Sequence, residues 1–583
     1  MKYRIIEPKI PGLEPYKTVL TNRGLNLQDI DRYLKVTSDE YLDPALIANI
    51  KEGVTLLIKH IQAGHDIFIQ VDSDADGLTS AALLINYLYN LFPSFVQNNI
   101  IYRLHNGKQH GLTEEILPII KQNNVKLIIA PDSSSNDYEM HEYLHNMGIE
   151  VLVIDHHEAD KVSEYACVIN NQLCDYPTKS LSGVGMVLKF CSYIDKLMGT
   201  NYANDLFDLA AIGIIADVMD LRDFETHYIV KKGLMNVCNP FIDEMCIRQE
   251  YSISKGNGLN PHTVGFYIAP FMNAVMRIGT QEDKLLLFES MLNYKGYEQI
   301  LSTKRGAKGQ LESRAEQACR NCVNVKNKQN KLVDSCLEKV ERIIKDKNLL
   351  DNKVLVLKLK KEFAIERAIG GLVANKLMSK YQRPVLMLNE IMHEDGGVTW
   401  EGSGRAPASI SFRTYLRDSG LVFLAEGHES ALGVGITDEN IDKFIAYSNE
   451  YFKDFDFDPV YSIDLVWDSN DICAQDIVKI ADLDSIWGQG LEKPLALIKN
   501  IKVDQSNVFM MKGNTLKITL PDNVNIIKFG FSDEEYEQLL SNSQGVVIID
   551  VIGECKKNEW NGFIYPQIEM IDYEIVRSMK YYF

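Results

Sequence analysis

The sequence has no long hydrophobic run. Across its 583 residues, no apolar stretch reaches the ~20 residues that a membrane-spanning helix needs. The opening MKYRIIEPKIPGLEPY also lacks the apolar core of a signal peptide. With 46% hydrophobic residues, the composition is that of an ordinary globular protein, and the length predicts several domains. We therefore expect a cytoplasmic protein without a membrane segment.

Paired cysteines are also lacking. The ten cysteines are scattered without paired spacing, which indicates a reduced protein rather than one cross-linked by disulfides. The single C-x-x-C, formed by Cys319 and Cys322, has no second pair or neighbouring histidine that would complete a zinc site. We interpret it as incidental.

Positive charge is scarce, because the formal net charge is −19. This value argues against a nonspecific polyanion binder in which basic charge covers the whole surface. The exception is the span 304–347, which carries twelve Lys or Arg against six Asp or Glu. On charge alone, this span fits a solvated helical connector.

Three aspartates alternate along the sequence at positions 72, 74 and 76. They follow the apolar strand candidate 66–71, and Gly77 lets the chain turn into a helix predicted from residue 78. Side chains at alternate positions of a strand share one face, so the three carboxylates can converge on a hard divalent cation. The alternatives are a plain acidic turn or a calcium loop, but no glutamate stands six residues after Gly77, as a calcium loop requires.

Three further apolar runs deliver acidic residues or histidines. The run 125–130 leads to Asp132, and the run 151–154 leads to Asp155 and the adjacent His156 and His157. The run 208–217, which we predict to be a third buried strand, ends at Asp217. In a parallel sheet covered by helices, the carboxyl ends of the strands meet at one edge, so these groups should share a crevice.

Each of these groups has a simpler interpretation when taken alone. Asp132 fits a turn, Asp217 could cap a helix or pair with Arg222, and adjacent histidines are usually surface or core residues. Their joint occurrence at strand ends favours a metal site. Oxygen ligands with one or two imidazoles suit manganese or magnesium better than zinc.

Together these motifs resemble the four signature motifs of the DHH phosphoesterase superfamily. They are the D-x-D-x-D-G, the Asp after the next strand, the D-H-H triplet and the Asp within AIGIIADVMDL. The longer pattern is similar to the RecJ branch of single-strand-specific 5′ to 3′ exonucleases. The resemblance implies two divalent cations, Mn²⁺ or Mg²⁺, held by Asp74, Asp76, Asp132, His156 and Asp217. It also places Asp72 and His157 in catalytic positions beside the metals.

The resemblance extends to residues that would bind the DNA strand. Arg277, in the segment IAPFMNAVMRIG, matches the arginine that neutralises the scissile phosphate, and Asn273 would order that segment. Three further matches would hold the 5′ end of the strand: Arg103 in a basic loop, and Ser403 and Arg405 in GSGRAP. The segment EGHESALG supplies Gly427 as a substrate-binding residue and His428 as a catalytic candidate. Trp560 would either stack on a base or belong to the core. Glu426 replaces the first glycine of the family's Gly-Gly-His, which puts the tightest turn of that loop in doubt.

These observations predict an α/β protein of several parts. We expect a lead-in (1–45) packed on a parallel-sheet catalytic DHH domain (46–300), a basic helical connector (301–350), a second α/β domain of the DHH-associated type (351–455) and a C-terminal OB-fold β-barrel (456–583). The resemblance suggests that the connector also forms a wall of the DNA channel. The glycine-rich LSGVGMVLK at 181–189 predicts either phosphate binding or close helix packing.

The resemblance implies a single-stranded-DNA exonuclease that releases 5′-mononucleotides. We expect a monomer that works with a single-strand-binding protein or a helicase. Two alternatives stay open. One is a DHH-family phosphodiesterase acting on short oligonucleotides or cyclic dinucleotides, and the other is a DNA-binding scaffold with a decayed site.

Overall fold

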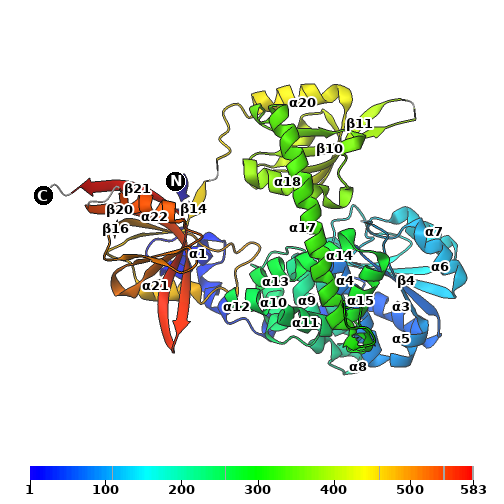
Figure 1. Cartoon of the computed structure of the whole chain (residues 1–583). Coiled ribbons are helices and arrows are strands. Elements are labelled where there is room, and N and C mark those ends of the chain that lie inside the picture. Colours follow the sequence, from blue (N-terminus) through cyan, green and yellow to red (C-terminus); the bar gives the residue numbers. More distant parts are fainter. Residues whose placement is uncertain (108, 257, 395, 459, 542–544, 581–583) are drawn as a thin grey trace.

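The computed structural model describes residues 1–107, 109–256, 258–394, 396–458, 460–541 and 545–580. Figure 1 shows three lobes: a large lobe, a smaller α/β lobe joined to it by the long helix α17, and a C-terminal lobe rich in strands. None of the helices in the described ranges combines the length and apolar character that a bilayer crossing requires.

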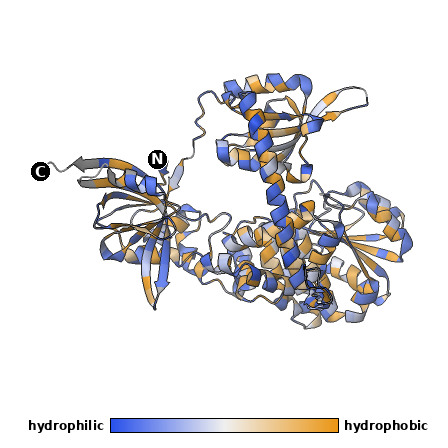
Figure 2. Ribbon diagram, in the orientation of Figure 1, coloured by the Kyte–Doolittle hydropathy of each residue, from blue (hydrophilic) through white to orange (hydrophobic). Residues whose placement is uncertain are grey.

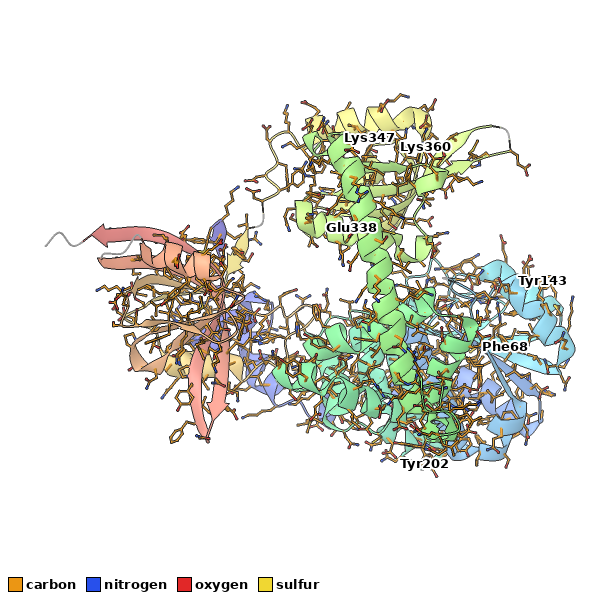
Figure 3. All side chains as sticks on the ribbon, viewed as in Figure 1. Phe68, Tyr143, Tyr202, Glu338, Lys347 and Lys360 are labelled. Atoms are coloured by element: carbon orange, nitrogen blue, oxygen red, sulfur yellow. The ribbon has the colours of Figure 1, made fainter. Side chains whose placement is uncertain are left out.

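The large lobe is built on a five-stranded parallel sheet in the order β3-β2-β4-β5-β6. Its strands are β2 (Asp66–Val71), β3 (Ile100–Leu104), β4 (Val125–Pro131), β5 (Glu150–Asp155) and β6 (Cys167–Asn170). Successive side chains point to opposite faces, so Ile67 and Ile69 enter one core whereas Phe68 enters another. Phe68 is labelled inside this lobe in Figure 3.

Helices cover both faces of this sheet. One face packs on α3 (Ile50–Gln62), α4 (Ala75–Leu91), α8 (Gly183–Met198) and α9 (Phe207–Ala216). The other carries α6 (Leu117–Gln122) and α7 (Tyr138–Asn146). Figure 2 shows hydrophobic residues concentrated where helices meet the sheet. The rest of the lobe is α5 (Pro93–Asn99), α10 (Phe224–Met235), α11 (Pro240–Arg248), α12 (Glu250–Lys255), α13 (Pro261–Tyr267), α14 (Ala269–Ile278), α15 (Gln281–Ser290), α16 (Asn293–Gly296) and the hairpin β7 (Gln299–Leu301) and β8 (Leu311–Ser313).

The strand prediction for 208–217 is wrong, because this segment is helix α9. All its residues from Phe207 to Ile214 are buried, since α9 packs against α4, α8 and α10. A helix that is apolar on every side has no amphipathic period to distinguish it from a buried strand. Asp217 still reaches the site, as the residue that caps the carboxyl end of α9.

Helix α17 (Arg314–Asp346) connects the two α/β lobes. It begins with a capping box in which Ser313 and Glu316 satisfy each other's backbone amides. Its first turns bury Cys319 and Cys322 in the core of the large lobe, and its last turns bury Val340 in the smaller lobe. The predicted helix within the basic connector is therefore present. Figure 2 shows mainly hydrophilic residues on its stretch between the lobes, where Figure 3 labels Glu338.

The smaller α/β lobe contains a five-stranded mixed sheet in the order β12-β13-β11-β10-β9. Only the β9/β10 pair is parallel. The elements are β9 (Leu355–Leu359), α18 (Arg367–Tyr381), β10 (Val385–Met392), β11 (Val398–Arg405), α19 (Phe412–Asp418), β12 (Val422–His428), β13 (Ala431–Thr437) and α20 (Asp438–Tyr451).

The C-terminal lobe contains a seven-stranded sheet in the order β15-β16-β20-β21-β19-β18-β17. Its strands are β15 (Leu465–Asp468), β16 (Ala496–Val503), β17 (Val508–Met511), β18 (Thr515–Thr519), β19 (Asn525–Phe529), β20 (Gly545–Trp560) and β21 (Phe563–Lys580). Two helices accompany it, α21 (Ala474–Ala481) and α22 (Asp533–Ser541).

The first part of the N-terminal segment packs on the C-terminal lobe, which was not expected, whereas Tyr41 and Leu42 pack on the large lobe as expected. Strand β1 (Tyr3–Ile5) pairs in parallel with β14 (Tyr461–Ile463), and α1 (Pro15–Asn22) contacts α21. Residues of α1 and α2 (Ile30–Leu34), including Tyr33, are buried in the core of that lobe. The expectation failed because the partner strands lie more than 400 positions away in the sequence, beyond the reach of local patterns.

Candidate metal centre

The first acidic residues of the site follow directly from the end of β2. Asp72 is 2% exposed, and its carboxylate accepts hydrogen bonds from the Gly111 amide (3.1 Å) and from Nδ1 of His110 (2.6 Å). Gly77 faces it closely, since a Cβ there would lie 2.5 Å from the Cβ of Asp72. Only glycine therefore allows α4 to begin so near the strand. Asp74 caps α4 by accepting a hydrogen bond from the Gly77 amide at 3.0 Å.

Asp76 in the first turn of α4 is held by the amino end of α8. Its carboxylate accepts hydrogen bonds from Ser182 Oγ (2.9 Å), the Gly183 amide (2.7 Å) and the Val184 amide (3.2 Å). Free amides at a helix amino end bind anions, and here the anion is supplied by the chain itself. Of the two interpretations of the glycine-rich segment, close packing is therefore the one supported.

Two glycines make room for the acids. A Cβ at Gly183 would lie 2.3 Å from Oδ1 of Asp132, and a Cβ at Gly213 in α9 would lie 2.4 Å from Oδ1 of Asp76. Real Cβ atoms do not approach other atoms so closely. The two helices can thus pass beside the carboxylates only where no side chain is present.

His156 lies among three carboxylates from three different elements. Its Nε2 is 3.3 Å from Oδ1 of Asp132, 3.4 Å from Oδ2 of Asp217 and 4.0 Å from Oδ2 of Asp76. Asp132 follows β4 with a positive φ of 62°, and its amide donates to the Ile154 carbonyl at the end of β5. The acids expected to share a crevice are brought together.

Asp155 supports the histidines from behind. It is fully buried and accepts hydrogen bonds from the amides of Ser135 (3.1 Å) and His156 (2.8 Å) and from Nδ1 of His157 (2.8 Å). The hydrogen bond to Asp155 outweighs burial and raises the pKa of His157 to about 9. Burial raises the pKa of Asp155, but the hydrogen bond from His157 and the charges of His157 and His156 together outweigh burial, so the net pKa is lowered. The sequence interpretation placed Asp155 in the crevice as the first letter of the D-H-H motif but gave it no role of its own.

The donor set fits divalent cations. Asp132 Oδ1 and His156 Nε2 are buried and make no hydrogen bond within the described residues. Burial and then the charges of neighbouring acids raise the pKa of Asp76 to about 6 and that of Asp217 to about 8. Three groups have ligand atoms within 4.8 Å of one another: Asp76, His156 and Asp217; Asp72, Asp74 and Asp132; and Asp132, Asp155, His156 and His157. Carboxylate oxygens with few imidazoles suit Mn²⁺ or Mg²⁺.

A cavity of about 210 Å³ opens onto these acids. Its lining includes Asp74, Asp76 and Asp217, and the loop histidine His110. Helix α14 supplies the opposite wall with Asn273 and Arg277. Asn273 accepts a hydrogen bond from the amide of the first residue of α4, as expected of a residue that orders this region.

A larger cavity of about 680 Å³ adjoins the first one. The two cavities share Ala216 and Asn273, and the larger one lies between the large and C-terminal lobes. Its lining combines aromatic rings with amines, including those of Phe266, Trp487 and Lys493. The candidate metal ligands Asp74, Asp76 and Asp217 line the smaller cavity and not this larger one.

Other residues expected at the site lie elsewhere. Arg103 points from β3 to an ion pair with Glu115 and does not line the acidic cavity. Ser403 and Arg405 lie on β11 of the smaller lobe, and Gly427 and His428 lie on β12 with His428 exposed. The side chain of Trp560 lies outside the described residues.

Arg405 of the smaller lobe lies near enough to Arg277, on the wall of the acidic cavity, for the two charges to interact. Burial, and next the charge of Arg277, lowers its pKa. Its guanidinium also passes close to α18, because a Cβ at Gly371 would lie 2.5 Å from its Nη2. Arg277 and Arg405 therefore belong to one positive region between the two α/β lobes.

Comparisons with known proteins agree with this arrangement. The model of the DHH family, N-terminal domain, matches residues 66–214, and that of the RecJ OB domain matches residues 463–572. The chain is 35% identical to the "Putative SPbeta prophage-derived single-strand DNA-specific exonuclease YorK" of Bacillus subtilis, over 100% of this chain and 99% of that protein. It is 25% identical to Bacillus subtilis RecJ, over 95% of this chain and 67% of that protein.

A solved structure shares the fold. The crystal structure of Thermus thermophilus RecJ in complex with Mn²⁺ matches with a TM-score of 0.69 and 21% identity, over 98% of this chain and 79% of that one. The α/β architecture with a C-terminal OB domain, inferred from the motifs, is thus confirmed. The chain belongs to the RecJ branch of the DHH family.

Proposed function

We propose that this chain is a single-stranded-DNA-specific 5′ to 3′ exonuclease that releases 5′-mononucleotides with two divalent cations, Mn²⁺ or Mg²⁺. The observation that carries the proposal is the convergence of Asp76, Asp132 and Asp217 on Nε2 of His156. The relatives support it, because they are named single-strand DNA-specific exonucleases. Solved RecJ structures of Thermus thermophilus contain Mn²⁺ or Mg²⁺.

The cations would be held by Asp74, Asp76, Asp132, His156 and Asp217. Such a pair activates a water molecule and stabilises the entering and leaving oxygens of an in-line displacement at phosphorus. Burial, and next the charge of His157, lowers the pKa of His156 to about 4, so its imidazole is neutral at physiological pH and offers a lone pair. Asp155 fixes His157 next to it.

Arg277 would compensate the negative charge of the scissile phosphate. Its guanidinium lines the acidic cavity, near the charge of Asp74, and makes no hydrogen bond or ion pair within the described residues. A cation aimed at the position where charge develops stabilises the transition state. Asp72 would act through His110, which it orients toward the cavity.

The smaller lobe would hold the 5′ end of the strand. Arg405 shares a positive region with Arg277, and the hydroxyl of Ser403 lies beside the same glycine of α18 as the Arg405 guanidinium, an arrangement that suits a terminal phosphate. His428 and Gly427 would contact the strand from β12. A phosphate contact by Arg103 requires its guanidinium to leave Glu115.

The 3′ part of the strand would follow the larger cavity to the C-terminal lobe. This cavity offers rings for stacking and lysine amines for the backbone, the combination that single-strand binding uses, and the amine of Lys493 would exchange its ion pair with Asp484 for a phosphate. A preference for long strands would separate this proposal from a phosphodiesterase of short oligonucleotides or cyclic dinucleotides. We further propose a cytoplasmic monomer that acts with a single-strand-binding protein or helicase in DNA repair or recombination. Light scattering should give the mass of one chain.

The test compares 5′- and 3′-labelled single strands in the presence of Mn²⁺. The 5′-labelled strand should release labelled mononucleotide from the first turnover. The 3′-labelled strand should instead become progressively shorter while it keeps its label. Asp132→Asn should abolish turnover, whereas Asp160→Asn, at an exposed acid of a nearby loop, should match the wild type. Turnover preserved in Asp132→Asn would contradict the site, and the absence of Mn²⁺-dependent release from the wild-type chain would favour a decayed scaffold.

A further inference from the structure

Asp217 is held differently from the other acids of the site. Asp76 accepts three hydrogen bonds from the amino end of α8 and its cap, and Asp155 accepts four from its surroundings. Within the described residues, the Asp217 carboxylate accepts none, and its near contact is His156 Nε2 at 3.4 Å. The position of its carboxylate therefore depends on the backbone at the end of α9.

The backbone after Asp217 is joined to α9 as far as Met219, since the amides of Asp217 and Val218 donate to the carbonyls of Gly213 (2.9 Å) and Ile215 (3.2 Å). Val218 has a φ of 59°, a left-handed conformation that β-branched residues disfavour, and its side chain is 58% exposed. The amide of Met219 returns to the Ile214 carbonyl at 3.2 Å and closes the helix end. From residue 220 to residue 222, the chain is in contact with the C-terminal lobe and the N-terminal segment.

Leu221 is held by the C-terminal lobe and by the N-terminal segment that packs on that lobe. Its amide donates to the Gln489 carbonyl at 3.0 Å, and its carbonyl accepts from the Tyr33 hydroxyl at 2.5 Å. Its side chain lies against Gly488, where a Cβ would be 2.6 Å from Leu221 Cδ1. Two backbone groups that burial would otherwise leave unpaired are thus satisfied from another domain.

The turn that holds Leu221 is rigid because its neighbours are buried. Trp487 and Leu491 lie in the core of the C-terminal lobe, and so does Tyr33. Gly488 and Leu491 pair with each other through both backbone hydrogen bonds. Figure 1 shows the dark-blue N-terminal segment, which carries Tyr33, between the large and C-terminal lobes.

Gly490 completes the contact with the segment after Asp217. Its φ is 78°, and a Cβ there would lie 2.2 Å from Oδ1 of Asp220. Asp220 is in turn ion-paired with Arg222, whose Nη1 donates to the Arg23 carbonyl at 3.3 Å. Every residue from 220 to 222 therefore touches the C-terminal lobe or the N-terminal segment packed on it.

We propose that the turn 487–491, together with Tyr33, is a positioning element that sets the place of Asp217 in the metal centre. The C-terminal lobe is then required for cation binding itself, and not only for contact with the DNA strand. This inference rests on the proposed two-cation function. It predicts that loosening the turn weakens the site from about four residues away, without touching any ligand.

The test uses two variants of the full-length chain and one matched control. Gly490→Ala places a methyl group against Asp220, and Tyr33→Phe removes one hydroxyl while keeping the ring. Gly513→Ala is the control, because Gly513 also has a positive φ (81°) in the same lobe but has no atom within 4 Å of its Cβ position. Mn²⁺ binding is followed by electron paramagnetic resonance, and kcat and KM are measured on a 5′-phosphorylated thymidine dinucleotide, which minimises contact of the substrate with the C-terminal lobe.

Gly490→Ala and Tyr33→Phe should each weaken the binding of one Mn²⁺ by about 10-fold, the size of effect seen when a supporting residue behind a ligand is lost. kcat on the dinucleotide should fall while KM changes little, and Gly513→Ala should behave as wild type. Wild-type Mn²⁺ affinity and kcat in Tyr33→Phe and in folded Gly490→Ala would overturn the inference. If the wild-type chain itself bound no Mn²⁺, the proposed function would fail first, which separates the two outcomes.

Discussion

Replacing Gly183 by alanine should damage the metal centre without replacing any ligand. The added Cβ would lie 2.3 Å from Oδ1, 2.4 Å from Cβ and 2.5 Å from Cγ of Asp132. Unstrained contacts between such atoms begin at about 3.5 Å, so Asp132 or α8 must shift by about 1 Å. α8 cannot shift freely, because its amino end holds the Asp76 carboxylate through two amides.

The expected size of the effect follows from that displacement. Overpacking of this kind costs about 1–3 kcal/mol of stability, a loss that a large domain tolerates. Misplacement of a reacting group by about 1 Å costs on the order of 100-fold in rate. We therefore expect a folded Gly183→Ala protein with turnover reduced about 100-fold and Mn²⁺ affinity reduced about 10- to 100-fold.

Gly185→Ala is the matched control, two residues along the same helix. Its Cβ would meet Leu181 at 3.2 Å and Ile214 at 3.6 Å, and no acid of the site is among its nearest atoms. The assay combines a Mn²⁺ titration with the rate of mononucleotide release from a 5′-labelled strand. If Gly183→Ala bound Mn²⁺ and turned over as Gly185→Ala does, close approach of α8 to Asp132 could not be a requirement of the site.

Two further predictions concern stability. Lys189→Met should cost about 3–5 kcal/mol in urea unfolding, because it leaves Glu225, 1% exposed and 2.5 Å from the Lys189 amine, buried without its cation and with only the neutral donors Tyr176 and Leu42. The double variant Lys189→Met, Glu225→Gln should recover much of this loss, and an undiminished cost would refute the explanation. Burial, and next the charges of Asp76 and Asp74, raise the pKa of Asp217 to about 8. The native metal-free protein thus keeps a proton that the unfolded chain loses near pH 4, so its melting temperature in EDTA should fall as the pH rises from about 4 to about 8, and Mn²⁺ should reverse the fall. A flat melting profile in EDTA would contradict this assignment.

The strand ends of the site could be predicted from the sequence because their signals are local. The runs at β2, β4 and β5 are mainly apolar and are followed by acids, as is typical of buried parallel strands that lead to a site. The run before Asp217 is just as apolar, and only its packing between other helices distinguishes it as a helix. Both interpretations place Asp217 at the carboxyl end of the segment, so the site was predicted although the element was not.

Features that depend on distant contacts could not be predicted. The sequence around Tyr33 contains no signal for its hydrogen bond to Leu221. Arg103 was interpreted as a loop residue, but it lies on strand β3 and pairs with Glu115. His110 lies in the same basic loop as the one assigned to Arg103, but its hydrogen bond to Asp72 depends on the three-dimensional course of that loop, which the sequence does not reveal. Domain boundaries and the individual roles of the site residues stay predictions.

A crystal of the protein grown with Mn²⁺ gives the plainest check of the metal centre. Anomalous scattering should show two manganese ions in the acidic cavity, coordinated by the carboxylates of Asp76, Asp132 and Asp217 and by Nε2 of His156. The Asp132→Asn protein should lose at least one of them. A cavity without ions at saturating Mn²⁺, or ions bound only by other residues, would contradict the account.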